Sequence, residues 1–132
     1  MEKWEEIFKN TIPKGDYCTV VKNGEESGLN IELECSDHLV KINFGAVSAL
    51  RMFDEGILLN GVFDEKEVER FKGDKFSNVI YKLEKGEFGK FVKNASDELF
   101  DYLDLKHFII ITMNYVIEII SQWEPNIEVT KK

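Results

Sequence analysis

The fold is decided by residues 108–120, which read FIIITMNYVIEII. Residues 108–113 are apolar on both faces apart from Thr112, a pattern typical of a central strand that is buried on two sides. Asn114 and Tyr115 can form a tight turn, and residues 116–120 then return as the partner strand. We therefore predict a C-terminal β-hairpin buried in a sheet.

Upstream of this hairpin, the sequence predicts an antiparallel β-meander. Residues 17–22 are rich in strand formers, and residues 30–35 and 40–44 alternate between apolar and polar side chains. Asn23-Gly24 and Ser36-Asp37 are the predicted turns between them. A further strand is expected around Leu50 and Met52, and residues 57–62 are a candidate for one more.

Two short helices are predicted on either side of this meander. Trp4, Ile7 and Phe8 have helical spacing, so the first helix is expected at the N-terminus. Asp64 can cap a second helix that continues to residue 72, with Glu67 three positions on as in a capping box.

The region before the C-terminal hairpin is predicted as a strand followed by a helix. Residues 79–84 alternate as a strand does, and Phe88, Phe91 and Val92 restore helical spacing. This helix can extend to Leu103 or break at residues 94–96. Residues 123–127 are expected to form a tail that covers the sheet, with a frayed end after them.

These elements together predict an α+β fold with a mainly antiparallel, twisted sheet in one domain, residues 1–132. The expected order is an N-terminal helix, a β-meander, a short helix, a strand, a helix and a C-terminal β-hairpin. Strands occur in blocks and do not alternate one-for-one with helices, which disfavours a doubly wound α/β fold.

The charge balance bears on the class of partner. The chain carries 25 acidic and 17 basic residues, for a formal net charge of −8. Binding a phosphate backbone requires clustered Lys and Arg, so direct nucleic-acid binding is disfavoured. An acidic protein favours basic partners, although the acidity can equally serve solubility alone.

The sequence predicts a cytoplasmic protein. Residues 1–6 are acidic and amphipathic, unlike the basic, apolar start of a secretory signal. The longest apolar region, residues 108–120, is interrupted by Asn114 and Glu118 and is shorter than the roughly 20 residues that span a bilayer. No membrane association is expected, and Cys18 and Cys35 should stay reduced.

No motif for catalysis, a metal or a cofactor is recognisable. Residues 86–90, GEFGK, are the nearest approach to a phosphate-binding loop, but they lack its glycine spacing. Cys35 and His38 have a spacing that zinc can use, without a second pair to complete the site. Cys18 or Cys35 could pair with His107 for nucleophilic catalysis, but nothing local supports it. We therefore expect a protein that is not an enzyme and binds no cofactor.

Two charged positions stand out within apolar surroundings. Arg51 precedes Asp54-Glu55 at the end of an apolar run, and we interpret the three as a structural Arg–carboxylate bridge. Glu118 stands alone in an apolar strand, so it must either face water or pair with a cation.

The remaining acids group into two segments that we predict as partner-binding surfaces. Like charges at helical spacing destabilise their own helix slightly, which makes such clusters candidates for docking. The alternative is that they form merely soluble faces. The candidate residues are Glu65, Glu67 and Glu69 in one segment, and Asp97, Glu98, Asp101 and Asp104 in the other.

The chain resembles immunity proteins of bacterial polymorphic toxin systems, including those of contact-dependent growth inhibition. The resemblance lies in residues 105–110, LKHFII, residues 116–120, VIEII, and residues 123–125, WEP. It also includes residues 40–44, VKINF, followed by Arg51 and Asp54-Glu55. These are signatures of a strand scaffold, so they identify no contact residue.

The resemblance implies a cytoplasmic protein that binds a cognate toxin domain and occludes its active site. Such toxins are often nucleases, whose basic clefts an acidic inhibitor can occupy as a phosphate mimic. The alternative is a small-molecule-binding or enzymatic α+β domain with an apolar pocket. An adaptor for an unrelated protein is a third possibility, and the oligomeric state is left open.

Overall fold

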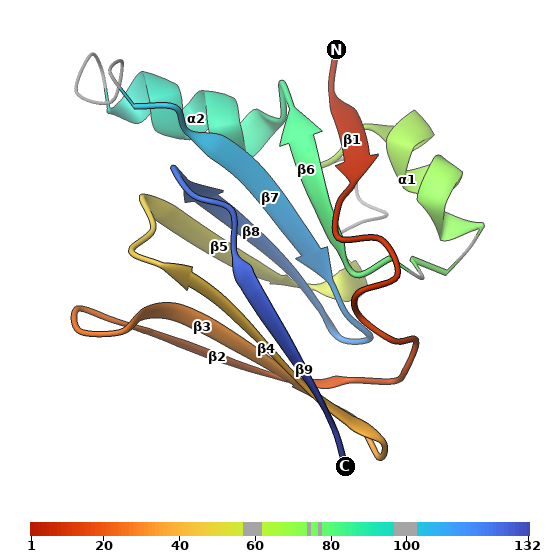
Figure 1. Cartoon of the computed structure of the whole chain (residues 1–132). Helices are drawn as coiled ribbons and strands as arrows, with labels where there is room; N and C mark the ends of the chain where they lie inside the picture. The colour runs from red at the N-terminus through yellow and green to blue at the C-terminus, as the bar shows by residue number, and fades with distance from the viewer. Residues whose placement is uncertain (57–61, 74, 77, 97–102) are drawn as a thin grey trace.

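The computed structural model describes residues 1–56, 62–73, 75–76, 78–96 and 103–132. Its elements form three layers, with a four-stranded sheet, a five-stranded sheet and two helices stacked in that order (Figure 1). The elements are β1 (Lys3–Glu6), β2 (Cys18–Gly24), β3 (Gly28–Glu34), β4 (His38–Gly45), β5 (Ala49–Asp54), α1 (Glu65–Lys72), β6 (Ile80–Glu84), α2 (Glu87–Ala95), β7 (Lys106–Ile111), β8 (Tyr115–Ser121) and β9 (Asn126–Lys131). The fold is therefore α+β and consists mostly of sheet.

The five-stranded sheet has the order β1-β6-β7-β8-β5, and every neighbouring pair is antiparallel. The hairpin of β7 and β8 lies inside this sheet, as the apolar run predicted. Phe108 and Ile110 face the four-stranded sheet, whereas Ile109 and Ile111 face α1. Ile109 is fully buried, as are its neighbours on both faces, because both sides of the sheet are covered.

The four-stranded sheet has the order β2-β3-β4-β9, and it contains the predicted meander. The predicted turn at Asn23-Gly24 is wrong, because β2 runs through both residues and Gly24 pairs with Gly28. The turn lies at residues 25–27 instead. Gly28 supplies the positive φ, 69°, and a Cβ there would lie 2.2 Å from the backbone of Gly45.

The predicted N-terminal helix is wrong, since residues 3–6 form the edge strand β1 on β6. Trp4 is buried against Phe71 and Tyr81 on the helix side of the sheet. Ile7 and Phe8 pack instead into the cluster between the two sheets. The three apolar residues thus serve two different clusters, and the chain turns at Phe8, where φ is 52°.

The predicted C-terminal tail is also wrong, because residues 126–131 form β9 and pair with β4. Ile127 and Val129 alternate with polar residues and pack against the cluster between the sheets. Lys131 pairs with His38, so the strand continues through the residues that we expected to fray.

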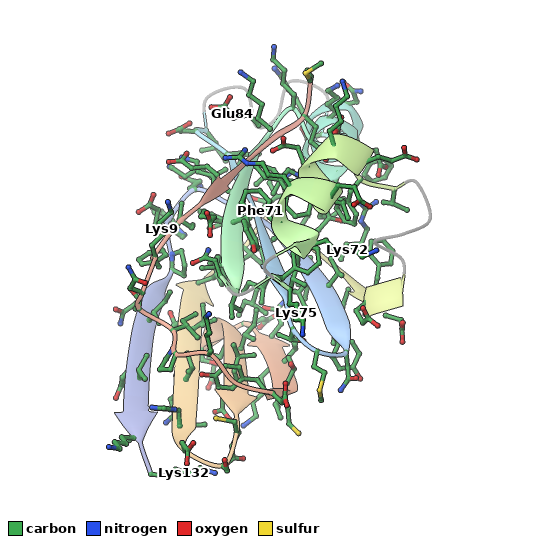
Figure 2. The ribbon with its side chains drawn as sticks, turned by 90° about the vertical axis from the view of Figure 1, so that its right-hand side faces the viewer. Lys9, Phe71, Lys72, Lys75, Glu84 and Lys132 are labelled. Atoms are coloured by element: carbon green, nitrogen blue, oxygen red, sulfur yellow. The ribbon has the colours of Figure 1, made fainter. Side chains whose placement is uncertain are left out.

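Both remaining helices are confirmed, but the predicted capping box is wrong, because the N–H of Asp64 donates to Glu2 and not to Glu67. Asp64 caps α1, where its Oδ1 accepts the N–H groups of Lys66 and Glu67 at 3.0 and 3.2 Å. Figure 2 shows Phe71 on α1, which packs onto the strands through Trp4 and Tyr81. The predicted extension of the second helix and the candidate strand at 57–62 fall mainly on residues outside the described part of the chain.

None of the helices in the described residues is both long enough and apolar enough to cross a membrane.

Candidate functional site

A row of charged side chains crosses three strands on the helix side of the five-stranded sheet. Arg51 on β5 lies opposite Glu118 on β8, and His107 on β7 lies diagonally across from Glu118. The Nε of Arg51 donates to Oε2 of Glu118 at 2.7 Å. The Nε2 of His107 lies 2.8 Å from Oε1 of the same carboxylate. Glu118 is fully buried, and each of its carboxylate oxygens has one of these side chains as its partner.

This row resolves the alternatives that the sequence left for Glu118. It does not face water but pairs with a cation, Arg51, as burial of a carboxylate requires. The predicted bridge from Arg51 to Asp54-Glu55 is wrong. Side chains at positions 51 and 54 of a strand point to opposite faces, and Asp54 instead accepts the N–H of Gly56.

Arg51 also ties the sheet to the first turn of α2. Its Nη2 lies 3.2 Å from the carboxylate of Glu87, and its guanidinium stacks 4.4 Å from the ring centroid of Phe88. A second ring, that of Phe53, lies 4.8 Å away. Because Arg51 contacts both Glu118 and α2, the buried row determines where this helix begins on the sheet.

Beside the row, a pocket of about 770 Å³ opens between α2, the end of β6 and the start of β7. Glu84, which lines it, lies at the end of the molecule opposite Lys132 (Figure 2). The lining contains five lysines and two carboxylates, which gives an excess of positive charge in an acidic protein. The lysines are Lys82, Lys85, Lys90, Lys93 and Lys106.

His107 forms part of the pocket wall. A carboxylate can only accept, so Nε2 donates to Glu118. Nδ1 is buried and has no hydrogen-bond partner. A Cβ on Gly86 would lie 2.7 Å from Nδ1 and one on Gly89 would lie 3.3 Å from it, so the absence of side chains there lets the imidazole lie against α2.

The N-terminus of α2 lacks a capping side chain. Its N-cap residue is Gly86. The first intrahelical bond runs from the N–H of Lys90 to the carbonyl of Gly86. The N–H groups of Glu87, Phe88 and Gly89 therefore have no partner among the described residues. The acidic side chain in this first turn, Glu87, is paired with Arg51.

The structure does not bring the predicted acidic contact residues together. Glu65 and Glu69 are exposed on α1, whereas Glu67 is 16% exposed and accepts the N–H of Trp4 at 2.8 Å. Asp104 is exposed and lies 3.2 Å from Lys106 at the lysine-lined pocket. Asp97, Glu98 and Asp101 lie outside the described residues.

The candidate metal and nucleophile sites are not assembled in the described part of the chain. It contains no group of three or more His, Cys, Asp or Glu residues that could hold a metal ion. Cys18 is exposed, and Cys35 packs against the cluster between the two sheets. His107 lies on the opposite side of the five-stranded sheet, with Glu118, so it does not meet Cys35.

Sequence reasoning named His107, Glu118 and residues 86–90 separately but missed the pocket that joins them. The lysines come from β6, α2, β7 and the segment after β6, so only the tertiary structure gathers them. The local signal was the spacing of Gly86, Gly89, Lys90 and Lys93, which places all four on one face of α2. Comparisons of the chain with protein-family models, with curated proteins and with solved structures found no match.

Proposed function

We propose that this protein is an immunity protein that binds and neutralises a cognate bacterial toxin domain. The observation that carries the proposal is the distribution of charge. Among the described ionisable residues, only His107 and Glu118 are buried charged groups, and they pair with each other. The chain has an excess of 25 acidic over 17 basic residues, and its other described acidic side chains are all reached by solvent.

A surface of this kind favours a basic partner. Unlike charges on two proteins steer their encounter and disfavour partners of the wrong sign. A nuclease toxin has a basic cleft because its substrate is a polyanion. Glu65 and Glu69 are the proposed contacts on α1, together with Asp97, Glu98, Asp101 and Asp104 in the second segment. Glu67 is a weaker candidate, since its carboxylate is occupied by Trp4.

The test is co-expression with the protein encoded immediately upstream, followed by co-purification and calorimetry at two salt concentrations. Reversing Glu65 and Glu69 to Lys should weaken binding by at least about tenfold. The matched control is reversal of Glu25 and Glu26, which are exposed at the turn between β2 and β3 and change the net charge equally. A neighbour that does not bind contradicts the proposal, and equal losses in both variants contradict α1 as the contact.

A second candidate function, the binding of a small molecule, is favoured by one specific observation. The pocket beside α2 has a buried histidine in its wall whose Nδ1 has no partner. Pockets that combine apolar walls with a few convergent polar groups are the usual sites for small ligands. Retention of a ligand through purification would support this candidate, and a ligand-free protein that binds the toxin would favour the first.

A further inference from the structure

We infer that the pocket beside α2 binds a small molecule bearing one or more phosphate groups. This inference rests on the small-molecule candidate and is independent of toxin binding. Three features converge on the pocket, namely unpaired lysines, free backbone N–H groups and the unpartnered nitrogen of His107.

The lysines supply the charge. Among the described residues, Lys82, Lys85, Lys90 and Lys93 have no ion-pair partner, whereas Lys106 is held by Asp104 and by the carbonyl of Gln122. Four unpaired ammonium groups around one pocket repel one another, and a bound anion removes that repulsion. Lysine is a common phosphate ligand that acts as a mobile point charge, so groups on several segments can converge on one phosphate.

The first turn of α2 supplies directed donors. The free N–H groups of residues 87–89 lie at the positive end of the helix, a position that binds phosphate in many proteins. A side-chain cap would normally occupy these donors, as Asp64 does in α1. At this end of the helix, Gly86, Gly89 and Lys90 line the pocket.

His107 provides the independent indication of a ligand. The residue is 6% exposed, and its Nδ1 has no hydrogen-bond partner. A buried polar atom without a partner is costly. A phosphate group accepts through its oxygens and, when monoprotonated, donates through its P–OH, so it can supply the missing partner of Nδ1 through a water that the phosphate holds. Glu118 keeps the imidazole oriented for this contact through Nε2.

The experiment is a titration of the full chain with inorganic pyrophosphate, followed by amide chemical shifts and by calorimetry. We expect shift changes centred on residues 86–90 and a dissociation constant in the range of about 10–500 μM. Substitution of Lys90 and Lys93 by Gln should weaken binding by about tenfold or more. The matched control replaces Lys66 and Lys72, two exposed lysines on α1, by Gln and should change binding by less than about twofold.

A second variant separates binding from folding. Gly89→Ala places a Cβ 3.3 Å from Nδ1 of His107 and narrows the pocket wall. Alanine is a better helix former than glycine, which opposes the cost of the tight contact with His107, so the thermal midpoint should change little while pyrophosphate binding falls. Unchanged pyrophosphate binding in this variant would show that the phosphate lies elsewhere and would overturn the assignment of the site.

Two outcomes would overturn the inference in distinguishable ways. No pyrophosphate binding at 10 mM, a concentration about tenfold above a weak 1 mM constant, would exclude a phosphate site. An uncharged ligand that occupies the pocket and ignores the Lys90→Gln/Lys93→Gln change would exclude the phosphate and keep the small-molecule candidate. Equal weakening in the α1 control would identify non-specific attraction by net charge.

Discussion

The helices α1 and α2 cover the same face of the five-stranded sheet, but different interactions hold them there. Asp64 caps α1, and Val68 and Phe71 pack it onto an aromatic cluster that includes Trp4 and Tyr81. No side chain caps α2, and its first turn lies over Arg51, Glu118 and His107. The position of α1 therefore depends on its own cap and on apolar burial. That of α2 depends on a smaller apolar cluster, in which Phe88 and Val92 pack on Ile120, together with the Arg51–Glu118 ion pair.

This difference indicates where function resides on the helix face. A buried ion pair gives little net stability compared with apolar packing of the same volume. The sheet is apolar beneath α1, whereas beneath α2 it combines the apolar Ile120 with the charged row, so stability alone does not explain the charged row. Positions where a fold departs from its own packing rules are commonly functional, and the lysine-lined pocket opens at this point.

The largest effect is expected when the charged row is broken at its centre. Glu118→Ala leaves Arg51 and His107 without their shared partner in a buried place, and it should lower the free energy of unfolding by about 3–5 kcal/mol. Urea denaturation measures this loss. The control is Glu87→Ala, which removes the exposed end of the same network and should cost less than about 1 kcal/mol.

The result for Glu118→Ala tests whether the position of α2 depends on the charged row. A loss below about 1 kcal/mol would mean that water replaces the carboxylate and that the network is not buried in solution. Amide hydrogen exchange provides a second measurement. In this variant the amides of α2 should lose protection from exchange, while those of α1 keep it.

The next effect tests the close contact between α2 and His107. A Cβ on Gly86 would lie 2.6 Å from Cε1 of His107, so Gly86→Ala should destabilise the protein by about 1–3 kcal/mol. Gly73→Ala at the end of α1 is the matched control. Nothing lies within 4 Å of a Cβ there, and φ is −57°, so we expect no loss or a small gain. Equal effects at the two glycines would contradict the contact.

Particular residues show how far sequence reasoning reached. The β7–β8 hairpin was predicted because its apolar run suits only an element covered on both faces, and α1 because Asp64 is a local signal. The edge strands β1 and β9 were missed for one physical reason. Each is short, and its identity depends on pairing with β6 or β4, which a local pattern does not contain.

The same limit applies to the candidate site. The isolated position of Glu118 predicted a paired or exposed carboxylate, but its partners follow from strand register, which places Arg51 opposite it and His107 on the diagonal. The pocket lysines lie on separate elements between residues 82 and 106. The net charge did not predict this cluster of lysines, because an overall charge of −8 contains no information about a local positive excess.

A smaller effect concerns the acids of α1, which we predicted as one partner-binding surface. Glu67 accepts the N–H of Trp4 on the edge strand β1, so Glu67→Ala should lower the free energy of unfolding by about 1–2 kcal/mol. Glu69→Ala, at an exposed position two residues away, should change it by less than about 0.5 kcal/mol. Equal values would contradict a structural role for Glu67.

The smallest effect tests the cap that distinguishes α1 from α2. Asp64→Ala frees the N–H groups of Lys66 and Glu67 and should cost about 1 kcal/mol, measured by urea denaturation beside Glu65→Ala as the exposed control. The start of α2 already lacks such a cap, and Gly86 has no space for a side chain that could provide one. A helix that forms without a cap must be held by its contacts with the sheet or by an anion at its free N–H groups. If added phosphate raises the midpoints of the unaltered chain and of the Asp64→Ala protein by the same amount, it does not replace the missing cap of α1, as expected for an anion that acts at α2. A larger rise in the Asp64→Ala protein would place the anion at α1 instead.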